Sequence, residues 1–191
     1  MKDYKFILAS GSPRRKELLA GLGLEFEVRL MPGIDESYPD GLTGEEIAKA
    51  ISQKKAEAYK ATMAQNELII TADTIVYLEG EVLGKPADNE EARQMLRKLR
   101  GRTHQVITGV TLLTHKRQHT FAANSSVTFS NITDEEIDYY VEKFHPLDKA
   151  GAYGIQEWIG YIGVERIEGS YFNVMGLPVQ RLYAELKSFT A

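Results

Sequence analysis

The spacing of apolar residues along the chain predicts interleaved strands and helices. Runs rich in β-branched residues predict strands at 5–9, 68–78, 105–113 and 118–129. Apolar residues three and four apart, preceded by capping residues, predict helices that begin near Ser12, Thr43, Asp88, Thr133 and Pro178. Because hairpins interrupt the alternation of strands and helices, we expect an α/β fold with a mixed β-sheet and flanking helices.

Local signals refine several boundaries. The first helix is expected over 12–22, with Ser12 as N-cap and Pro13 in the first helical position, and the second over 43–62. A strand followed by a loop is expected over 24–42, and a hairpin turn at 79–81. In the last helix the following residues are expected to face inward: Val179, Leu182, Tyr183 and Leu186.

The stretch "ILASGSPRRKELL" places two arginines where a strand gives way to a helix. The first N–H groups of a helix lack partners and carry partial positive charge, so this junction is a natural anion site. The Ser10 hydroxyl and the guanidinium groups of Arg14 and Arg15 would add donors suited to phosphate. From spacing alone, an ordinary helix start with two solvated arginines explains the stretch equally well.

Two charged residues interrupt apolar patterns. Asp73 lies within "LIITADTIVYL", where an unpaired carboxylate would be costly to bury, so it must be paired, protonated or bound to a cation. Lys55 falls on the inner face that Ile47 and Ile51 define. A lysine there more commonly extends its ammonium group to solvent, although it would also reach a phosphate in a cleft.

An acidic loop, "GIDESYPDG", supplies Asp35 and Glu36. Composition favours a solvated loop, but one or two loop acids together with Asp73 would hold magnesium alongside substrate phosphates. Lys85, in "LGKP", reads by itself as an exposed loop lysine.

Composition narrows the classes of function. The formal net charge of −4 argues against a dedicated nucleic-acid binder. The absence of cysteine excludes disulfides and thiolate sites and suits a reducing cytoplasm. No apolar run is long enough to span a membrane, and no signal peptide is evident. Phosphate binders and carboxylates without a nucleophile fit metal-assisted attack of water on a phosphate.

Four segments together resemble the Maf family of nucleoside triphosphate pyrophosphatases: "LASGSPRRKELL", "TADTIVYLEGEVLGKP", "DKAGAYGIQ" and "EGSYFNVMGLP". The resemblance spans essentially the whole chain. It implies a single domain over 1–191, related in fold to the inosine triphosphate pyrophosphatases, elongated and with a cleft between two lobes. It also implies cleavage of a nucleoside triphosphate to the monophosphate and pyrophosphate, with Mg²⁺ or Mn²⁺ as cofactor.

The resemblance assigns roles to individual residues. Ser10, Arg14 and Arg15 match the phosphate-binding loop, and Lys55 and Lys85 match two lysines near the phosphates. Glu36 and Asp73 match the acids linked to the metal, with Asp73 as proton acceptor.

The resemblance also indicates a subfamily. The reading "AGAYGIQ" is typical of members that act on dTTP and UTP, in which Arg14, Thr74 and Gln156 hold the specificity positions. Glu157 and Trp158 depart from the small residues common at that point, so Trp158 either lines the base pocket or packs outside it.

Two alternatives stay open beside dTTP/UTP hydrolysis. One is a pyrophosphatase for purine or 7-methyl-GTP substrates, and the other is a nucleotide-binding regulator of septum formation with little turnover. The resemblance suggests a homodimer, and we expect no nucleic-acid or membrane partner.

Overall fold

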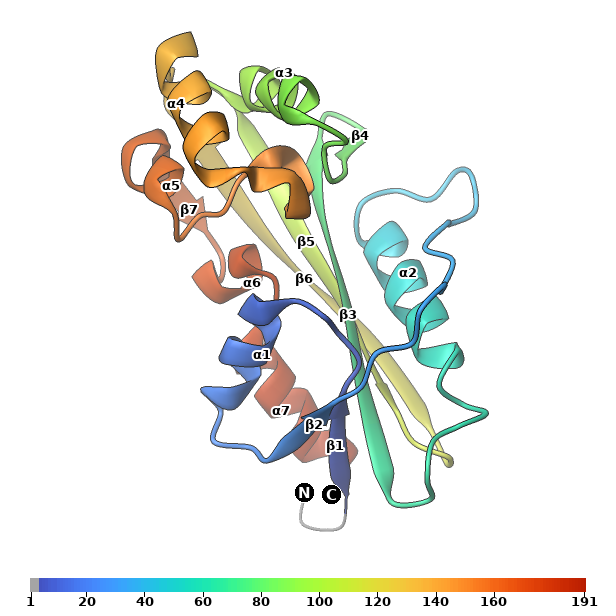
Figure 1. The fold of residues 1–191 in the computed structure, drawn as a ribbon. Helices are drawn as coiled ribbons and strands as arrows, with labels where there is room; N and C mark the ends of the chain where they lie inside the picture. Colours follow the sequence, from blue (N-terminus) through green and yellow to red (C-terminus); the bar gives the residue numbers. More distant parts are fainter. Residues whose placement is uncertain (1–3) are drawn as a thin grey trace. The chain divides into compact units, whose positions relative to one another are not determined.

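The computed structural model describes residues 4–191 and confirms the mixed α/β architecture (Figure 1). Among these residues seven strands form one sheet in the order β2-β1-β3-β5-β6-β7, with β4 paired to β3. The strands are β1 (Lys5–Leu8), β2 (Phe26–Val28), β3 (Glu67–Leu78), β4 (Glu81–Leu83), β5 (Thr103–Leu113), β6 (Gln118–Phe129) and β7 (Val164–Glu168). β1 runs parallel to β2 and β3, whereas β4 and β7 pair antiparallel with β3 and β6.

Helices separate and follow the strands. They are α1 (Pro13–Ala20), α2 (Glu45–Glu57), α3 (Asn89–Leu99), α4 (Asp134–Phe144), α5 (Trp158–Gly163), α6 (Tyr171–Met175) and α7 (Val179–Phe189). Two short 3₁₀ turns, Pro146–Asp148 and Ala150–Ala152, follow α4. No helix among residues 4–191 has the length and apolar character needed to cross a membrane.

The chain divides into two compact units. The first comprises Met1–Thr74, Thr108–Ala123 and Gly176–Ala191, and the second comprises Ile75–Ile107 and Asn124–Met175. The long strands β3, β5 and β6 therefore contribute residues to both units. The expected cleft between two lobes stays a prediction.

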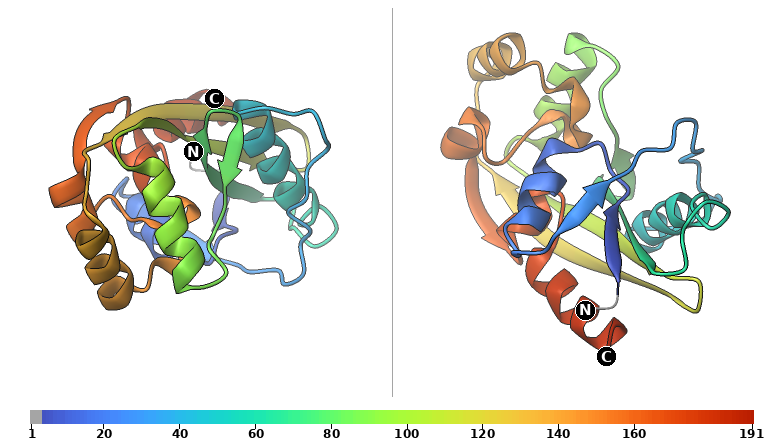
Figure 2. Two further views of the ribbon diagram at one scale, coloured as in Figure 1. Left: turned by 90° about the horizontal axis from the view of Figure 1, so that it is seen from above. Right: turned by 60° about the horizontal axis from the view of Figure 1, so that its bottom comes forward.

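In the first unit, α2 lies on one side of the strands and α1 and α7 lie on the other (Figures 1 and 2). Small residues let α2 approach β5 closely: a Cβ built on Gly109 would lie 2.2 Å from the carbonyl oxygen of Ala48. Ser52 and Ala56 continue the Ala48 stripe at four-residue spacing and are fully buried. This close packing fixes the distance between the α2 side chains and the sheet.

The second unit has its own core. α3 and α4 pack together, and their apolar faces meet strand residues such as Val127 and Phe129 in one hydrophobic cluster. Tyr140, on α4, is completely buried in that cluster although it carries a hydroxyl group. The cluster also includes Tyr153 and Ile155, which follow the 3₁₀ turns.

Capping chemistry explains most helix starts. The Thr133 hydroxyl accepts a hydrogen bond from the Glu136 N–H, and the Glu136 carboxylate accepts one from the Thr133 N–H, which completes the predicted capping box. Asp88 caps α3 through the Glu91 N–H at 2.8 Å. Ser12 caps α1, and Pro13 occupies the first helical position as predicted.

Several sequence predictions need correction. α2 begins after Gly44, which has a φ of 46°, because the Glu46 carboxylate accepts from Thr43 while the Thr43 hydroxyl caps nothing. It ends at Glu57 rather than near residue 62, since separate three-residue turns follow. Tyr183 is 39% exposed rather than inward-facing. The sequence did not predict α5, β7 or α6.

Candidate active site

Two neighbouring residues of β3 organise the charged and polar side chains of the first unit. Successive strand residues point to opposite faces of a sheet. Asp73 points to the face that α2 covers, as does Thr71, whose hydroxyl donates to the Ser52 carbonyl oxygen at 2.7 Å. Thr74 points to the face that α1 covers. The predicted site residues of the first unit therefore gather into two groups, one on each face of β3.

On the α2 face, Lys55 holds two carboxylates together. Its Nζ lies 2.7 Å from Asp73 Oδ1 and 3.1 Å from Glu36 Oε1. The Lys55 and Asp73 side chains are only 14% and 13% exposed, whereas that of Glu36 is 56% exposed. Asp73 is thus a paired carboxylate, one of the alternatives that its position demanded, and the Lys55 ammonium group is engaged rather than solvated.

The acidic loop reaches this cluster because a second lysine fixes it from outside. Lys54 Nζ lies 2.6 Å from Asp35 Oδ2 and donates to the Ser37 carbonyl oxygen at 2.9 Å. Hydrogen bonds from Lys54 and Ser37 hold the pKa of Asp35 below its usual range. Adjacent lysines therefore bind adjacent loop acids: Lys54 binds the outer acid, and Lys55 binds Glu36 beside Asp73.

The arrangement of carboxylates fits a divalent cation. Hard cations such as Mg²⁺ and Mn²⁺ take oxygen ligands, and Mg²⁺ commonly uses one or two carboxylates plus phosphate and water. Asp73 and Glu36 already converge on one cationic nitrogen. Residues 4–191 contain no group of three or more His, Cys, Asp or Glu side chains that could hold a metal alone. A metal bound here would therefore depend on substrate oxygens and water as well.

On the α1 face, the start of the first helix forms as the sequence predicts. Ser10 Oγ accepts a hydrogen bond from the Ser12 N–H at 3.3 Å, and Ser12 Oγ accepts one from the Arg15 N–H at 3.4 Å. The first turn of α1 contains no acidic residue, and Arg14 lies there half-buried. The junction keeps the features of an anion site: exposed Gly11, hydroxyl groups and positive charge at a helix N-terminus.

Arg15 makes contacts that the sequence did not anticipate. Its Nε donates to the Gly176 carbonyl oxygen at 2.8 Å, and its terminal nitrogens donate to the Ala72 carbonyl oxygen at 2.8 Å and to Thr74 Oγ1 at 3.0 Å. Burial lowers the pKa of Arg15 from its usual value, and the nearby Asp73 charge opposes that shift. Arg15 therefore ties α1 to β3 and to the segment before α7, with few donors left for a phosphate.

Thr74 is the centre of this second group. Arginine only donates hydrogen bonds, so Thr74 Oγ1 accepts from Arg15, and it also lies 2.8 Å from Thr108 Oγ1 on β5. Sequence reasoning missed Thr108 and Gly176. Thr108 sits in an unbroken β-forming run with nothing to distinguish it. Gly176 has a positive φ of 120°, and the only signal for it in the sequence is that the residue is a glycine, followed by Leu177 and Pro178.

The other two predicted residues, Lys85 and Gln156, belong to the second unit. Lys85 follows β4 and is exposed. The preceding Gly84 accepts a hydrogen bond from the Gly151 N–H at 3.0 Å, which joins the Lys85 loop to the "AGAYGIQ" segment. Trp158 packs edge to face on Tyr139, with ring centroids 4.8 Å apart.

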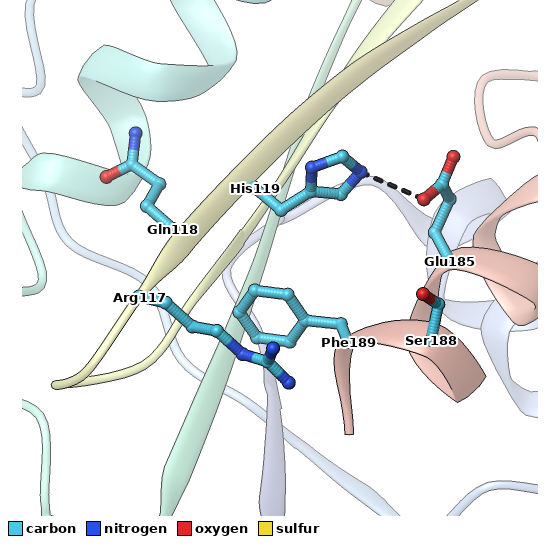
Figure 3. Close-up of a pocket in the computed structure, with 6 residues that line it drawn as sticks. All are labelled: Arg117, Gln118, His119, Glu185, Ser188 and Phe189. Carbon is cyan, nitrogen blue, oxygen red and sulfur yellow. Dashed lines mark hydrogen bonds and ion pairs between the residues drawn. The ribbon is translucent and has the colours of Figure 1, made fainter. Parts of the chain in front are cut away.

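A separate surface pocket of about 280 Å³ lies in the first unit. Figure 3 shows its lining residues, which come from the β5–β6 hairpin and α7: Arg117, Gln118, His119, Glu185, Ser188 and Phe189. His119 Nε2 lies 2.9 Å from Glu185 Oε2, and the Arg117 guanidinium lies 4.3 Å from the centre of the Phe189 ring. No predicted site residue lines this pocket, and Arg117 and His119 each contact another lining residue, so we assign it to hairpin packing.

Comparisons with known proteins identify the family of this chain. The family model described as "Maf-like protein" matches residues 5–189. A Phocaeicola vulgatus protein named dTTP/UTP pyrophosphatase is 64% identical over 187 residues, which cover 98% of this chain and 97% of that protein. A Bacteroides thetaiotaomicron protein of the same name is 59% identical over the same coverage.

Among solved structures, a HAM1 protein from Coxiella burnetii is similar in fold, with a TM-score of 0.51 and 15% identity, over 97% of this chain and 99% of that one. At that identity the likeness concerns the fold alone. The family match extends over nearly the whole chain and includes every residue singled out above. The chain belongs to the Maf family.

Proposed function

We propose that this protein hydrolyses dTTP and UTP to the corresponding monophosphates and pyrophosphate. The observation that carries the proposal is the Glu36–Lys55–Asp73 cluster, in which two carboxylates and one ammonium group meet beside β3. Full-length relatives named dTTP/UTP pyrophosphatase, 59–64% identical to this chain, support the choice of substrate.

In this reaction a water oxygen attacks the α-phosphorus, and the bond from that phosphorus to the bridging oxygen breaks. Asp73 accepts the proton that the water loses. Lys55 holds the Asp73 carboxylate in place and stabilises negative charge on the phosphates. The α1 N-terminus, with Ser10 and Arg14, binds phosphate oxygens, while Arg15 orients that loop and Thr74. Lys85 contributes a further positive charge for the leaving pyrophosphate.

Glu36 and Asp73 are the residues that would hold Mg²⁺ or Mn²⁺. When bound, the cation supplies neutralisation of phosphate charge and a more acidic water. The 56% exposure of the Glu36 side chain leaves it accessible to an ion from solvent. Removal of divalent ions with EDTA should therefore abolish turnover, and added Mg²⁺ or Mn²⁺ should restore it.

Base selection falls to Arg14, Thr74 and Gln156. A glutamine amide both donates and accepts hydrogen bonds, as the edge of a thymine or uracil ring requires. We also propose that the enzyme works in the cytoplasm as a homodimer, since the chain lacks cysteine and the family resemblance suggests a dimer. Light scattering at micromolar concentration tests the oligomeric state.

The proposed function is tested by pyrophosphate release in the presence of Mg²⁺ or Mn²⁺ with dTTP, UTP, CTP, GTP, ITP and 7-methyl-GTP. Fast release confined to dTTP and UTP is the expected result. Turnover mainly of a purine nucleotide would overturn the choice of base while keeping the chemistry. Nucleotide binding without any release would instead favour the regulator of septum formation.

A further inference from the structure

The turn that carries Gln156 is held by a network of buried polar side chains in the second unit. The turn closes through a hydrogen bond from the Glu157 N–H to the Gly154 carbonyl oxygen at 2.9 Å. Gln156 is therefore the third of four residues in a closed turn. Its backbone position depends on whatever fixes Gly154 and Glu157.

Tyr140 and Lys149 fix both ends of that turn. The Tyr140 hydroxyl donates to one carboxylate oxygen of Glu157 and accepts from the Gly154 N–H at 3.0 Å. Lys149 Nζ lies 3.1 Å from the other Glu157 oxygen, and its side chain is only 9% exposed. Burial and the Glu157 carboxylate raise the pKa of Tyr140 above its usual value, so its hydroxyl stays protonated and keeps donating.

Gly154 brings Gln156 against this network. A Cβ at residue 154 would lie 3.0 Å from Glu157 Cδ, 3.0 Å from Lys149 Cε and 3.2 Å from Gln156 Nε2. The Gln156 amide nitrogen thus packs beside Gly154, next to the Lys149–Glu157 ion pair. A side chain at residue 154 would push one of these groups away.

The amide oxygen of Gln156 is left without a partner. Gln156 Oε1 is buried and has no hydrogen-bond partner among residues 4–191. A buried acceptor without a donor is costly, and such an atom in a native structure calls for an explanation. A bound ligand that offers an N–H group would satisfy it.

We propose that Tyr140, Lys149 and Glu157 are positioning residues that hold Gln156 Oε1 as a hydrogen-bond acceptor for pyrimidines with an imide N–H. This inference rests on the proposed function. Thymine and uracil carry an N–H between two carbonyl groups, whereas cytosine presents a lone pair at that ring nitrogen. A fixed acceptor therefore favours the first two bases, and a mobile amide would rotate to suit cytosine.

The test compares Tyr140→Phe with Tyr139→Phe, a matched change at the adjacent residue, which is 44% exposed and whose hydroxyl contacts Lys143. Steady-state kcat and KM are measured for dTTP, UTP and CTP. We expect Tyr140→Phe to raise KM for dTTP and UTP about tenfold, the value of one hydrogen bond, while kcat stays within about twofold. The preference over CTP should fall by the same factor, and Tyr139→Phe should leave it unchanged.

Glu157→Gln provides a second variant at a half-buried residue. It keeps an acceptor for Tyr140 but loses the charge opposite Lys149, so we expect a smaller fall in preference, about threefold. An equal fall in kcat/KM for all three nucleotides would mean a merely structural role and would overturn the inference. So would Tyr140→Phe behaving like Tyr139→Phe.

Binding separates this inference from the proposed function. If the wild-type protein releases no pyrophosphate from dTTP or UTP, the proposed function has failed. Calorimetric binding of dTMP and dCMP then still decides the inference. Tighter binding of dTMP that Tyr140→Phe abolishes would support it, and equal binding of both nucleotides by the wild-type protein would contradict it.

Discussion

The Glu36–Lys55–Asp73 cluster and the turn that carries Gln156 differ in which polar groups they leave available to a ligand. In the first unit, carboxylates from a loop and a strand meet an ammonium group from α2, and one of them stays open to solvent. In the second unit, the charges of Lys149 and Glu157 are satisfied within the turn, and a neutral amide oxygen is left over. The first arrangement suits charged phosphates and a cation, and the second suits the edge of a base. The role of the cluster in phosphate chemistry and the role of Gln156 in base selection can therefore be tested separately.

The largest effect is expected from Asp73→Ala. Loss of the proton acceptor should lower kcat by about 10³-fold, within the range usual for general bases, while the nucleotide still binds. Pyrophosphate release and calorimetric nucleotide binding measure the two quantities.

Asp35→Ala is the control for Asp73→Ala, because Asp35 is an exposed acid that contacts Lys54 rather than Lys55. It should retain most of the activity. Hydrolysis by Asp73→Ala at the wild-type rate would remove Asp73 from the mechanism.

Lys55→Met and Lys54→Met sharpen the comparison within α2. Both changes remove an ammonium group and keep the length of the side chain. Only Lys55 contacts Asp73, so Lys55→Met should lower kcat about 100-fold, and Lys54→Met should lower it about threefold at most through the loop. Similar losses in the two variants would indicate a general effect of charge rather than a specific contact.

A fall in pH should destabilise the second unit through protonation of His104. Burial lowers the pKa of His104 to about 4, and His104 Nε2 lies 2.7 Å from the hydroxyl of Tyr153, close to the Gln156 turn. In the unfolded chain His104 binds a proton near pH 6.5. The free energy of unfolding should therefore fall as the pH drops from about 6.5 to 4, by roughly 3 kcal/mol in total.

Urea unfolding at several pH values measures the His104 contribution. His104→Gln cannot titrate, so the free energy of unfolding of that variant should depend less steeply on pH across the same range. Identical slopes for the variant and the wild-type protein would assign the acid sensitivity to other groups.

The smallest effect on rate is expected from Gln156→Ala. It should lower the preference for dTTP over CTP about tenfold and leave the maximal rate of phosphate chemistry within about twofold. Equal rate losses on every nucleotide would count against a role in selection. The ratio of kcat/KM values for the two nucleotides is the measurement.

Among the candidate site residues, the sequence pointed most clearly to those whose charge interrupts an apolar pattern. Asp73 and Lys55 stood out because each breaks a periodicity, and the structure shows why: each is the partner of the other. Helix starts with strong capping residues, such as Thr133, were also predictable. These signals are local or concern one residue type in the wrong place.

Other features depend on contacts that no local pattern contains. The hydrogen bond from Arg15 Nε to the Gly176 carbonyl oxygen joins residues 161 positions apart, and no sequence feature near Arg15 indicates it. The burial of Lys149 is offset by Glu157 and Asp148, which read separately as ordinary loop acids. α5, β7 and α6 have only five or six residues each, too few for a helical or alternating period to show.

The assignment of Lys55 to phosphate chemistry rather than base selection is tested most directly by the dTTP-to-CTP ratio of kcat/KM in Lys55→Met, measured at high enzyme concentration. Our account predicts that both values fall about 100-fold and that their ratio stays at the wild-type value, because Lys55 acts on phosphates that the two nucleotides share. A ratio that collapses toward one would contradict it, since base selection would then depend on the charged cluster itself.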